Sequence, residues 1–285
     1  MTILNETYTL SNGVEIPKLG LGTWLIDDDK AADAVRAAIE IGYRNIDTAQ
    51  AYGNEGGVGE GVRTSGLPRE ELFVSTKLAA ELKDYGQAAA AIDESLSKLD
   101  IGYIDLMLIH APQPWDDFRG GDYAEGNLAA WRALEKAHQA GKIRSIGVSN
   151  FLRADLENIL QNGTIAPHVN QILVHAGNTP AELITYCQSK DILVEAYSPI
   201  AHGEILKNPD VATVADSYGV SVPQLCIRYT LQLGTVSLPK TANTDHMRAN
   251  AQCDFVISDE DMDTLRNLDE RDYGDSSAFA VYSGK

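Results

Sequence analysis

The chain has few cysteines, few basic residues and no long apolar run. Its three cysteines are scattered without Cys-x-x-Cys spacing, which argues against a disulfide framework or a zinc cluster, so we expect buried apolar side chains. Lysine and arginine number 23 against 41 acidic residues, and the formal net charge of −18 argues against nucleic acid or an anionic membrane as main partner. No stretch approaches about 18 uninterrupted apolar residues, and residues 1–6 lack the basic start of a signal peptide. We therefore expect a soluble, cytoplasmic protein.

The chain also lacks a long linker rich in proline, serine or glycine, so we expect one domain over residues 1–285. Strand-like and helix-like stretches alternate, which indicates parallel strands joined by helical crossovers. Eight strands are expected, at residues 19–22, 43–47, 72–76, 105–110, 143–149, 169–173, 192–196 and 235–239. Helices are expected at residues 28–41, 87–99, 125–140, 179–189, 211–217, 223–233 and 259–268.

Eight such strands predict an α/β fold of the (β/α)8 TIM-barrel type, with extra C-terminal helices. Asn12-Gly13 between two short strands predicts an N-terminal β-hairpin, placed to close the bottom of the barrel. Asn178-Thr179-Pro180 and Ser258 are expected to begin helices. The rival, an open doubly wound sheet, would need a glycine-rich turn after an early strand, whereas the glycines of residues 56–61 fall inside a predicted helix.

Four ionisable residues lie at or just beyond the ends of predicted strands. Asp47, Lys77 and His110 each end an apolar run, and Tyr52 follows Asp47 by five residues. A parallel barrel gathers its strand ends on one rim, so these groups are expected to share a pocket. An acid, a phenol, an amine and an imidazole suit proton transfer to a substrate oxygen better than nucleophilic or metal chemistry.

The expected chemistry follows from the ionisation of these groups. A carbonyl group that accepts a hydride develops negative charge on oxygen and needs a proton or a strong hydrogen bond there. A phenol titrates near pH 10, a nearby ammonium lowers that pKa, and a carboxylate keeps the ammonium charged. Tyr52 is therefore the expected proton donor, supported by Lys77 and Asp47, and His110 is expected to orient the carbonyl.

Nearly the entire chain resembles the aldo-keto reductase family. The resemblance rests on several motifs in the family's order: GYRNIDTA at 42–49 with YGNE at 52–55, STKL at 75–78, the strand ending in His110, GKIRSIGVSNF at 141–151, VNQ at 169–171 and LPKT at 238–241. Several motifs in one order are much more specific than any single short pattern. The resemblance is greatest to bacterial reductases acting on keto-sugar acids, such as 2,5-diketo-gluconic acid, and on diketones and small aldehydes.

The resemblance implies a nicotinamide cofactor bound without a Rossmann fold, because no side chain supplies a hydride. Ser149, Asn150 and Gln171 match the family's carboxamide ligands, and Tyr197 matches the aromatic side chain that stacks on the nicotinamide. The other implied cofactor contacts are Gly22, Thr23, Trp24, Asp47, Ser198, Pro199, Ile200, Lys240, Thr241, His246 and Asn250.

The resemblance also favours NADP(H), because Lys240 and Thr241 match the pair that contacts the adenosine 2′-phosphate. His246 stands where relatives often have arginine, and Ala249 replaces a frequent glutamate. A histidine is mostly neutral at pH 7.5, whereas arginine stays charged and bonds bidentately. We therefore expect a reduced preference for NADPH, with some use of NAD(H), although Arg248 remains an alternative phosphate ligand.

Trp24 and Trp115 are expected to form apolar walls of the substrate pocket, beside Tyr52 and His110. Ala79 replaces a tryptophan common in relatives, and the polar tail after residue 268 is not expected to close over a large apolar ligand. These features predict a broad pocket for small or medium carbonyl compounds. We also expect a monomer without a bound metal.

Three other functions stay open from the sequence. A Schiff-base aldolase would use Lys77 as its nucleophile, but Asp47 is expected to keep that amine charged. A slow-turnover regulatory barrel could retain the nicotinamide site. A metal-dependent hydrolase lacks its expected His-x-His pair, since the six histidines show no ligand spacing.

Overall fold

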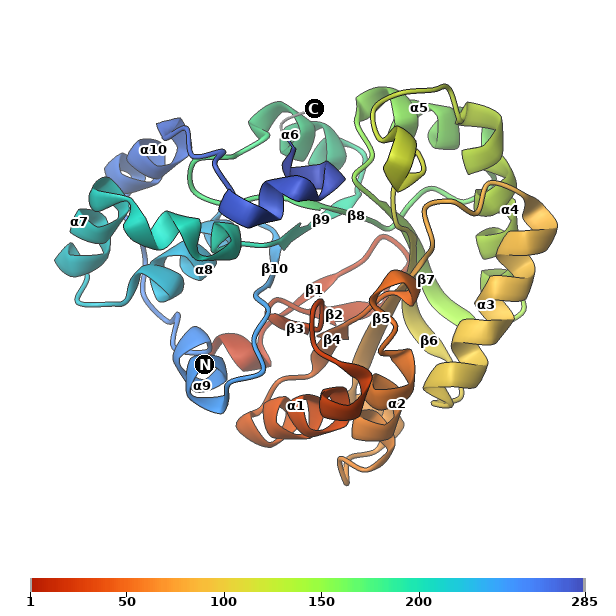
Figure 1. Ribbon diagram of the computed structural model, residues 1–285, viewed down its shortest axis with the longest axis horizontal. Helices are drawn as coiled ribbons and strands as arrows, with labels where there is room; N and C mark the ends of the chain where they lie inside the picture. Colours follow the sequence, from red (N-terminus) through yellow and green to blue (C-terminus); the bar gives the residue numbers. More distant parts are fainter. Residues whose placement is uncertain (1, 284–285) are drawn as a thin grey trace.

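A computed structural model of the protein describes residues 2–283. Eight parallel strands form one sheet in the order β10-β9-β8-β7-β6-β5-β4-β3, which confirms the predicted barrel (Figure 1). The strands are β3 (Gly20–Gly22), β4 (Asn45–Asp47), β5 (Phe73–Leu78), β6 (Ile104–Ile109), β7 (Ile143–Ser149), β8 (Val169–Leu173), β9 (Leu193–Tyr197) and β10 (Val236–Leu238). The barrel closes between its first and last strands, where Gly22 N donates to Pro239 O (3.0 Å) and Ser237 N to Lys18 O (2.9 Å).

The predicted hairpin is also confirmed. Strands β1 (Thr7–Thr9) and β2 (Glu15–Pro17) pair antiparallel, and Gly13 adopts a φ of +83° in the turn between them. Leu10 and Ile16 are buried against apolar side chains near the first residues of the barrel strands, including Phe73 and Val169. The hairpin therefore seals the amino-terminal end of the barrel, and only the opposite rim is left for a site.

Helices surround the barrel (Figure 1). They are α1 (Asp28–Ile41), α2 (Glu55–Arg63), α3 (Tyr85–Leu99), α4 (Ala124–Gln139), α5 (Arg153–Asn162), α6 (Ala181–Ser189), α7 (Pro209–Ser217), α8 (Val222–Gln232), α9 (Thr244–Asn250) and α10 (Asp259–Asn267). Short 3-10 segments are η1 (Ile3–Asn5), η2 (Gln50–Tyr52), η3 (Arg69–Glu71), η4 (Trp115–Asp117), η5 (Ala201–Lys207), η6 (Gly274–Ala278) and η7 (Ala280–Tyr282). The seven helices predicted by range are present, the helix expected around residues 56–61 is α2, and α5 and α9 are additional.

The two predicted helix starts have different outcomes. Ser258 caps α10 as expected, because its Oγ accepts from Asp261 N at 3.1 Å. The prediction for Asn178 and Thr179 was wrong, since α6 begins at Ala181 without a side-chain cap. The Thr179 hydroxyl instead donates to His175 O at 3.2 Å, within the loop that leads from β8.

The glycines of residues 56–61 have a packing role. They lie in α2, where a Cβ added at Gly57 or Gly59 would collide with the backbone carbonyl oxygens of Asp28 and Leu99. Glycine at these positions lets α2 approach the start of α1 and the end of α3. This placement inside a helix agrees with the exclusion of a phosphate loop.

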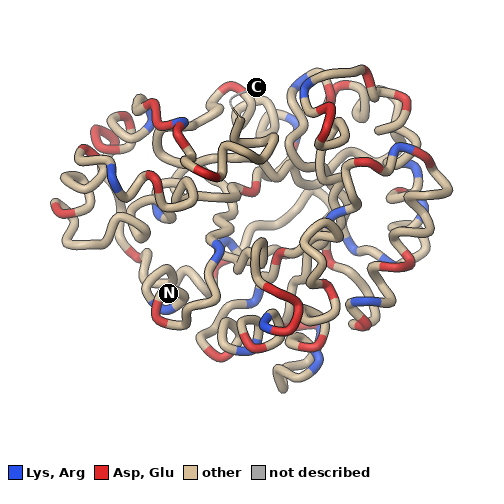
Figure 2. Tube along the Cα trace, viewed as in Figure 1, with Lys and Arg blue, Asp and Glu red and all other residues tan. Residues whose placement is uncertain are grey.

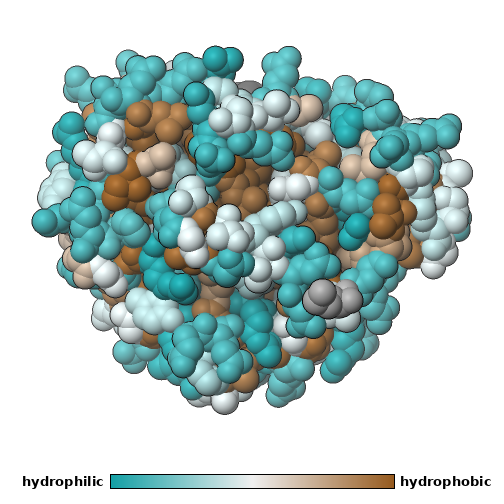
Figure 3. Space-filling model, turned by 180° about the vertical axis from the view of Figure 1, so that it is seen from behind, coloured by the Kyte–Doolittle hydropathy of each residue, from teal (hydrophilic) through white to brown (hydrophobic). Residues whose placement is uncertain are grey.

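All three cysteines are buried and free, as predicted. Positions of basic and acidic residues are interspersed along the outer helices (Figure 2). The face opposite the view of Figure 1 is largely hydrophilic, with separate apolar patches (Figure 3). Across residues 2–283, no helix combines the length and apolar character needed to cross a membrane.

Candidate active site

The structure brings the four strand-end residues together. Asp47 is the last residue of β4, Lys77 lies in β5, and His110 directly follows β6. These strands are neighbours and parallel, so their carboxyl ends share one rim. Tyr52 ends η2, and the left-handed backbone of Gly53 then turns the chain into α2. Four side chains from separate segments of the chain therefore lie together at this rim of the barrel.

Lys77 occupies the centre of this group. Its Nζ donates to both carboxylate oxygens of Asp47 (2.7 and 2.8 Å), to Thr48 O (2.8 Å) and to the Tyr52 hydroxyl (3.4 Å). Burial opposes the charge on Lys77, but the contacts with Asp47 and the neighbouring acidic groups outweigh it and raise the pKa of Lys77. Lys77 is therefore a fixed ammonium that links the carboxylate to the phenol.

Tyr52 and His110 are the two ring side chains on which the charge of Lys77 acts. Burial raises the pKa of Tyr52, and the Lys77 ammonium partly offsets that rise. Burial, together with the charge of Lys77, lowers the pKa of His110 well below its usual range, so its imidazole is neutral at physiological pH. The two rings lie edge to face with centroids 5.7 Å apart, and His110 Nδ1 has no partner among the described residues.

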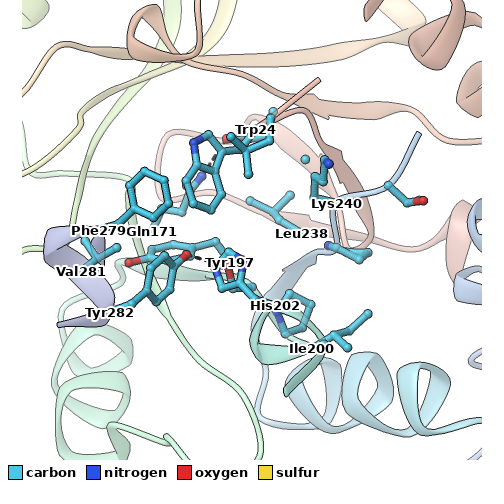
Figure 4. A pocket seen from close by; sticks show the side chains of 18 of the residues that line it. Trp24, Gln171, Tyr197, Ile200, His202, Leu238, Lys240, Phe279, Val281 and Tyr282 are labelled. Atoms are coloured by element: carbon cyan, nitrogen blue, oxygen red, sulfur yellow. Dashed lines mark hydrogen bonds between the residues drawn. The ribbon is translucent and has the colours of Figure 1, made fainter. Parts of the chain in front are cut away.

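A cavity of about 930 Å³ opens above these residues and extends across the rim from Trp115 to α9. Its walls include every residue assigned to the cofactor or substrate from the sequence except Thr23. Thr23 is buried beneath the wall, where its hydroxyl donates to Asp47 O at 3.0 Å and ties β3 to β4. Figure 4 shows the side chains around this cavity, with Trp24 and Tyr197 on its walls and Lys240 farther along.

Ser149, Asn150 and Gln171 lie beside the tetrad of Asp47, Tyr52, Lys77 and His110. Ser149 Oγ donates to Gln171 O (2.9 Å), and Asn150 Nδ2 donates to His110 O (3.0 Å). Asn150 has a left-handed backbone (φ 60°), which turns its side chain back over the end of β7. The Tyr197 hydroxyl donates to Asn150 Oδ1 at 2.6 Å, so the aromatic ring is fixed beside the amides.

Lys240, Thr241 and His246 line the other end of the cavity, and Arg248 does not. Thr241 Oγ1 accepts from Asn243 N (3.0 Å), and Asn243 in turn caps α9 by accepting from His246 N (3.2 Å). This cap holds His246 in the first turn of the helix, facing the cavity. One end of the cavity has neutral side chains that form hydrogen bonds and the flat ring of Tyr197, and the other end has basic side chains. This arrangement fits a nicotinamide dinucleotide.

The carboxyl-terminal segment differs from the expectation. Phe279 to Tyr282 line the cavity, and the rings of Phe279 and Tyr282 pack on Trp24 with centroids 4.9 and 6.1 Å away (Figure 4). The Tyr282 hydroxyl bonds to Ser198 Oγ at 2.8 Å. The expectation of an open pocket followed the average polarity of the tail, whereas two aromatic residues near its end decide how it packs.

Ala79 also lies elsewhere than expected. It lines a separate cavity of about 460 Å³ between η2 and α3, with Gln50 and Glu55. The Gln50 side chain accepts from Ala79 N at 2.8 Å, and neither residue lines the main cavity. The small residue at this position therefore does not enlarge the main cavity.

Reasoning from the sequence missed Glu195. This residue is fully buried in β9, two residues before Tyr197, so both side chains point into the barrel. Gln171 Nε2 donates to Glu195 Oε2 at 2.9 Å. The available signal was an acidic residue inside the otherwise apolar strand segment 192–197.

Known proteins resemble this chain over nearly its full length. A sequence profile described as the "Aldo/keto reductase family" matches residues 18–270. A glyoxal reductase of Bacillus subtilis is 43% identical over 274 residues, which cover 95% of this chain and 96% of the relative. An aldo/keto reductase structure from Brucella melitensis has a TM-score of 0.87 at 37% identity and covers 94% of this chain and 99% of that one.

A solved aldo-keto reductase from Bombyx mori in complex with NADP has a TM-score of 0.84 at 35% identity. The match covers 97% of this chain and 98% of that one. The profile match and these relatives agree with the barrel fold. The chain belongs to the aldo/keto reductase family and is an oxidoreductase.

Proposed function

We propose that this protein reduces aldehydes and ketones to alcohols with NAD(P)H, and that Tyr52 donates the proton. The observation that carries the proposal is the chain of contacts from Asp47 through Lys77 to the Tyr52 hydroxyl, at the wall of a cavity that fits a dinucleotide. The bound nicotinamide would supply the hydride. Proton donation, orientation of the carbonyl and stabilisation of charge are assigned to side chains of this protein.

Tyr52 is the proposed acid because its hydroxyl faces the cavity and stays protonated at neutral pH. Charge that develops on the substrate oxygen is stabilised as the proton moves toward it, and Lys77 stabilises the phenolate that remains. His110, being neutral, donates or accepts a single hydrogen bond and orients the carbonyl without adding charge. Asp47 holds Lys77 in place through two contacts.

The cofactor assignment extends this proposal. Ser149, Asn150 and Gln171 would hold the carboxamide, and the ring of Tyr197 would lie against the nicotinamide. Lys240, Thr241, His246 and Asn250 lie at the end proposed for the adenosine phosphate, which favours NADP(H) and leaves room for NAD(H). The Bombyx mori relative in complex with NADP supports this choice of cofactor class.

Small aldehydes and dicarbonyl compounds are the proposed substrates. Trp24, Trp115 and Phe279 provide apolar walls near Tyr52, and the tail covers part of the opening. The relative named glyoxal reductase supports a small dicarbonyl substrate. Keto acids, keto sugars and diketones belong to the same proposed range.

A spectrophotometric screen tests the proposal. Oxidation of NADPH and NADH is followed at 340 nm against a panel of aldehydes, α-ketoesters, diketones and keto acids. We expect turnover with small aldehydes or dicarbonyls and a higher kcat/KM with NADPH. Cofactor binding without turnover of any carbonyl compound would favour the regulatory barrel, and borohydride trapping of substrate on Lys77 would favour the aldolase.

A further inference from the structure

One amide joins two buried carboxyl groups beneath the cavity. Gln171 Nε2 donates to Asp47 Oδ1 at 2.8 Å and to Glu195 Oε2 at 2.9 Å. A primary amide has two N–H groups, so both are used. Gln171 and Glu195 lie side by side in the register of β8 and β9, which keeps this contact short. The nitrogen end of the amide is therefore anchored in the barrel wall.

The oxygen end of the same amide is free. Gln171 lines the cavity, and among the described residues nothing donates to its side-chain carbonyl oxygen. Because the amide is planar, fixing both N–H groups toward the carboxyl groups directs the oxygen away from them. A flipped amide would set its oxygen against the carboxyl oxygens and lose both bonds.

Glu195 has no other partner that explains its burial. Its second oxygen, Oε1, makes no hydrogen bond within residues 2–283, and the residue is fully buried. Burial, with the negative charge of Asp47 close by, raises the pKa of Glu195 well above its usual range. A neutral carboxyl group still accepts an N–H bond through its carbonyl oxygen. The contact with Gln171 thus persists without a second buried charge.

We propose that Glu195 is a positioning residue for the cofactor: it accepts the second N–H of Gln171 and so presents the Gln171 oxygen to an N–H of the nicotinamide carboxamide. This inference rests on the proposed function. Asp47 alone leaves the amide one anchor, about which it can rotate. With Glu195 as the second anchor, the oxygen is oriented before the cofactor arrives, and binding does not bear the cost of ordering it.

Equilibrium binding tests this role without reference to turnover. Quenching of protein fluorescence gives the Kd for NADPH and for the reduced thionicotinamide and 3-acetylpyridine analogues of NADP. The thionicotinamide keeps the N–H donors, whereas the acetylpyridine lacks them. Glu195→Met removes the acceptor at similar length, and Glu195→Gln keeps an acceptor oxygen and serves as the matched control. Glu195→Val, which suits a β-strand, replaces Glu195→Met if that variant does not fold.

We expect Glu195→Met to raise the Kd for NADPH and for the thionicotinamide analogue about tenfold, which is the scale of one buried hydrogen bond. The Kd for the acetylpyridine analogue should rise less than about twofold. Glu195→Gln should stay within about threefold of wild type for all three ligands. The role would be overturned if Glu195→Met lost the same affinity for all three dinucleotides or lost none. It would also be overturned if Glu195→Gln bound them as weakly as Glu195→Met. If the wild type binds none of the dinucleotides, the proposed function itself fails.

Discussion

At the Tyr52 hydroxyl, burial and charge act on the pKa in opposite directions. Burial raises it, and the ammonium of Lys77, 3.4 Å away, lowers it. The sequence predicts the ammonium beside Tyr52 but not the burial of its hydroxyl, because burial depends on the neighbours that the fold supplies. The residue types of the tetrad were thus predictable, whereas the balance of forces on each residue required the structure.

Tyr52→Phe should lower carbonyl reduction by at least about 100-fold, because general acid catalysis typically contributes 10²–10⁴-fold. Cofactor affinity should change by no more than a few-fold, since only the hydroxyl is lost. Steady-state turnover and the Kd for NADPH measure the two effects. Tyr85→Phe, which alters a half-exposed ring on α3, is the control. A Tyr52→Phe variant that kept more than about a tenth of wild-type turnover would exclude Tyr52 as the acid.

Lys77→Met should lower turnover and move the alkaline limb of the pH–rate profile to higher pH. The Lys77 ammonium lowers the pKa of Tyr52. Its removal therefore raises that pKa, and the phenol keeps its proton to higher pH. Asp47→Asn should also lower turnover, because the buried Lys77 loses the carboxylate that raises its pKa and holds it beside Tyr52. The profiles are compared under conditions where chemistry limits the rate. An unchanged alkaline limb in Lys77→Met, together with full turnover in Asp47→Asn, would remove these residues from proton transfer.

His246→Arg should widen the preference for NADPH over NADH about tenfold at pH 8, because arginine binds a phosphate bidentately at any pH. Values of kcat/KM for both cofactors in the wild type and the variant measure this preference. Arg248→Lys, outside the cavity wall, is the control. A preference unchanged by His246→Arg would leave discrimination to Lys240 and Thr241.

At the level of elements, the alternation of apolar and polar residues was sufficient to predict the barrel strands and the main helices. Segments 143–149 and 169–173 match β7 and β8 residue for residue. The pattern did not reveal α5 or the seven-residue α9. The packing of the tail on Trp24 was also missed, because it depends on contacts between residues more than 250 positions apart. Glu195 was overlooked for the same reason, since its role requires Gln171 from the neighbouring strand.

Gly59→Ala should destabilise the protein by more than about 2 kcal/mol, because the added methyl group meets the Leu99 carbonyl and overpacking a tight contact costs about 1–3 kcal/mol. Gly56→Ala in the same helix is the matched control, since its methyl group would make only ordinary contact with Asp28. That variant should be neutral or stabilising by up to about 1 kcal/mol, as alanine favours helix. Chemical denaturation measures both. Equal effects would show that α2 is not closely packed at Gly59.

For the whole molecule, the net charge of −18 is the dominant electrostatic feature. Like charges spread over a closed barrel repel one another in the folded state, and salt screens that repulsion. We expect Tm to rise when NaCl is increased from about 10 mM to about 150 mM, where the Debye length shortens to about 8 Å. Scanning calorimetry at constant pH measures the change. A lower Tm in salt would mean that favourable ion pairs outweigh the excess negative charge.

The residues from the hairpin to η7 pack against one barrel, and we propose that residues 1–285 form one folding unit and a monomer. Tyr43 shows the long-range coupling on which this proposal rests, because its hydroxyl donates to Met247 O in α9, 204 positions away. Light scattering and sedimentation would measure the oligomeric state. A dimer at micromolar concentration would contradict the second half of the proposal.

The burial of all three cysteines also affects how readily their thiols are chemically modified. Thiolates are nucleophiles that react with aldehydes and dicarbonyl compounds and are converted by oxidants, and the rate depends on exposure and on the thiolate fraction. Cys187, Cys226 and Cys253 are sealed in the interior, and burial raises the pKa of Cys226 and of Cys253 to about 12. Each thiol is therefore both inaccessible and protonated. The three thiols are thereby shielded from reaction with the carbonyl compounds that the enzyme reduces.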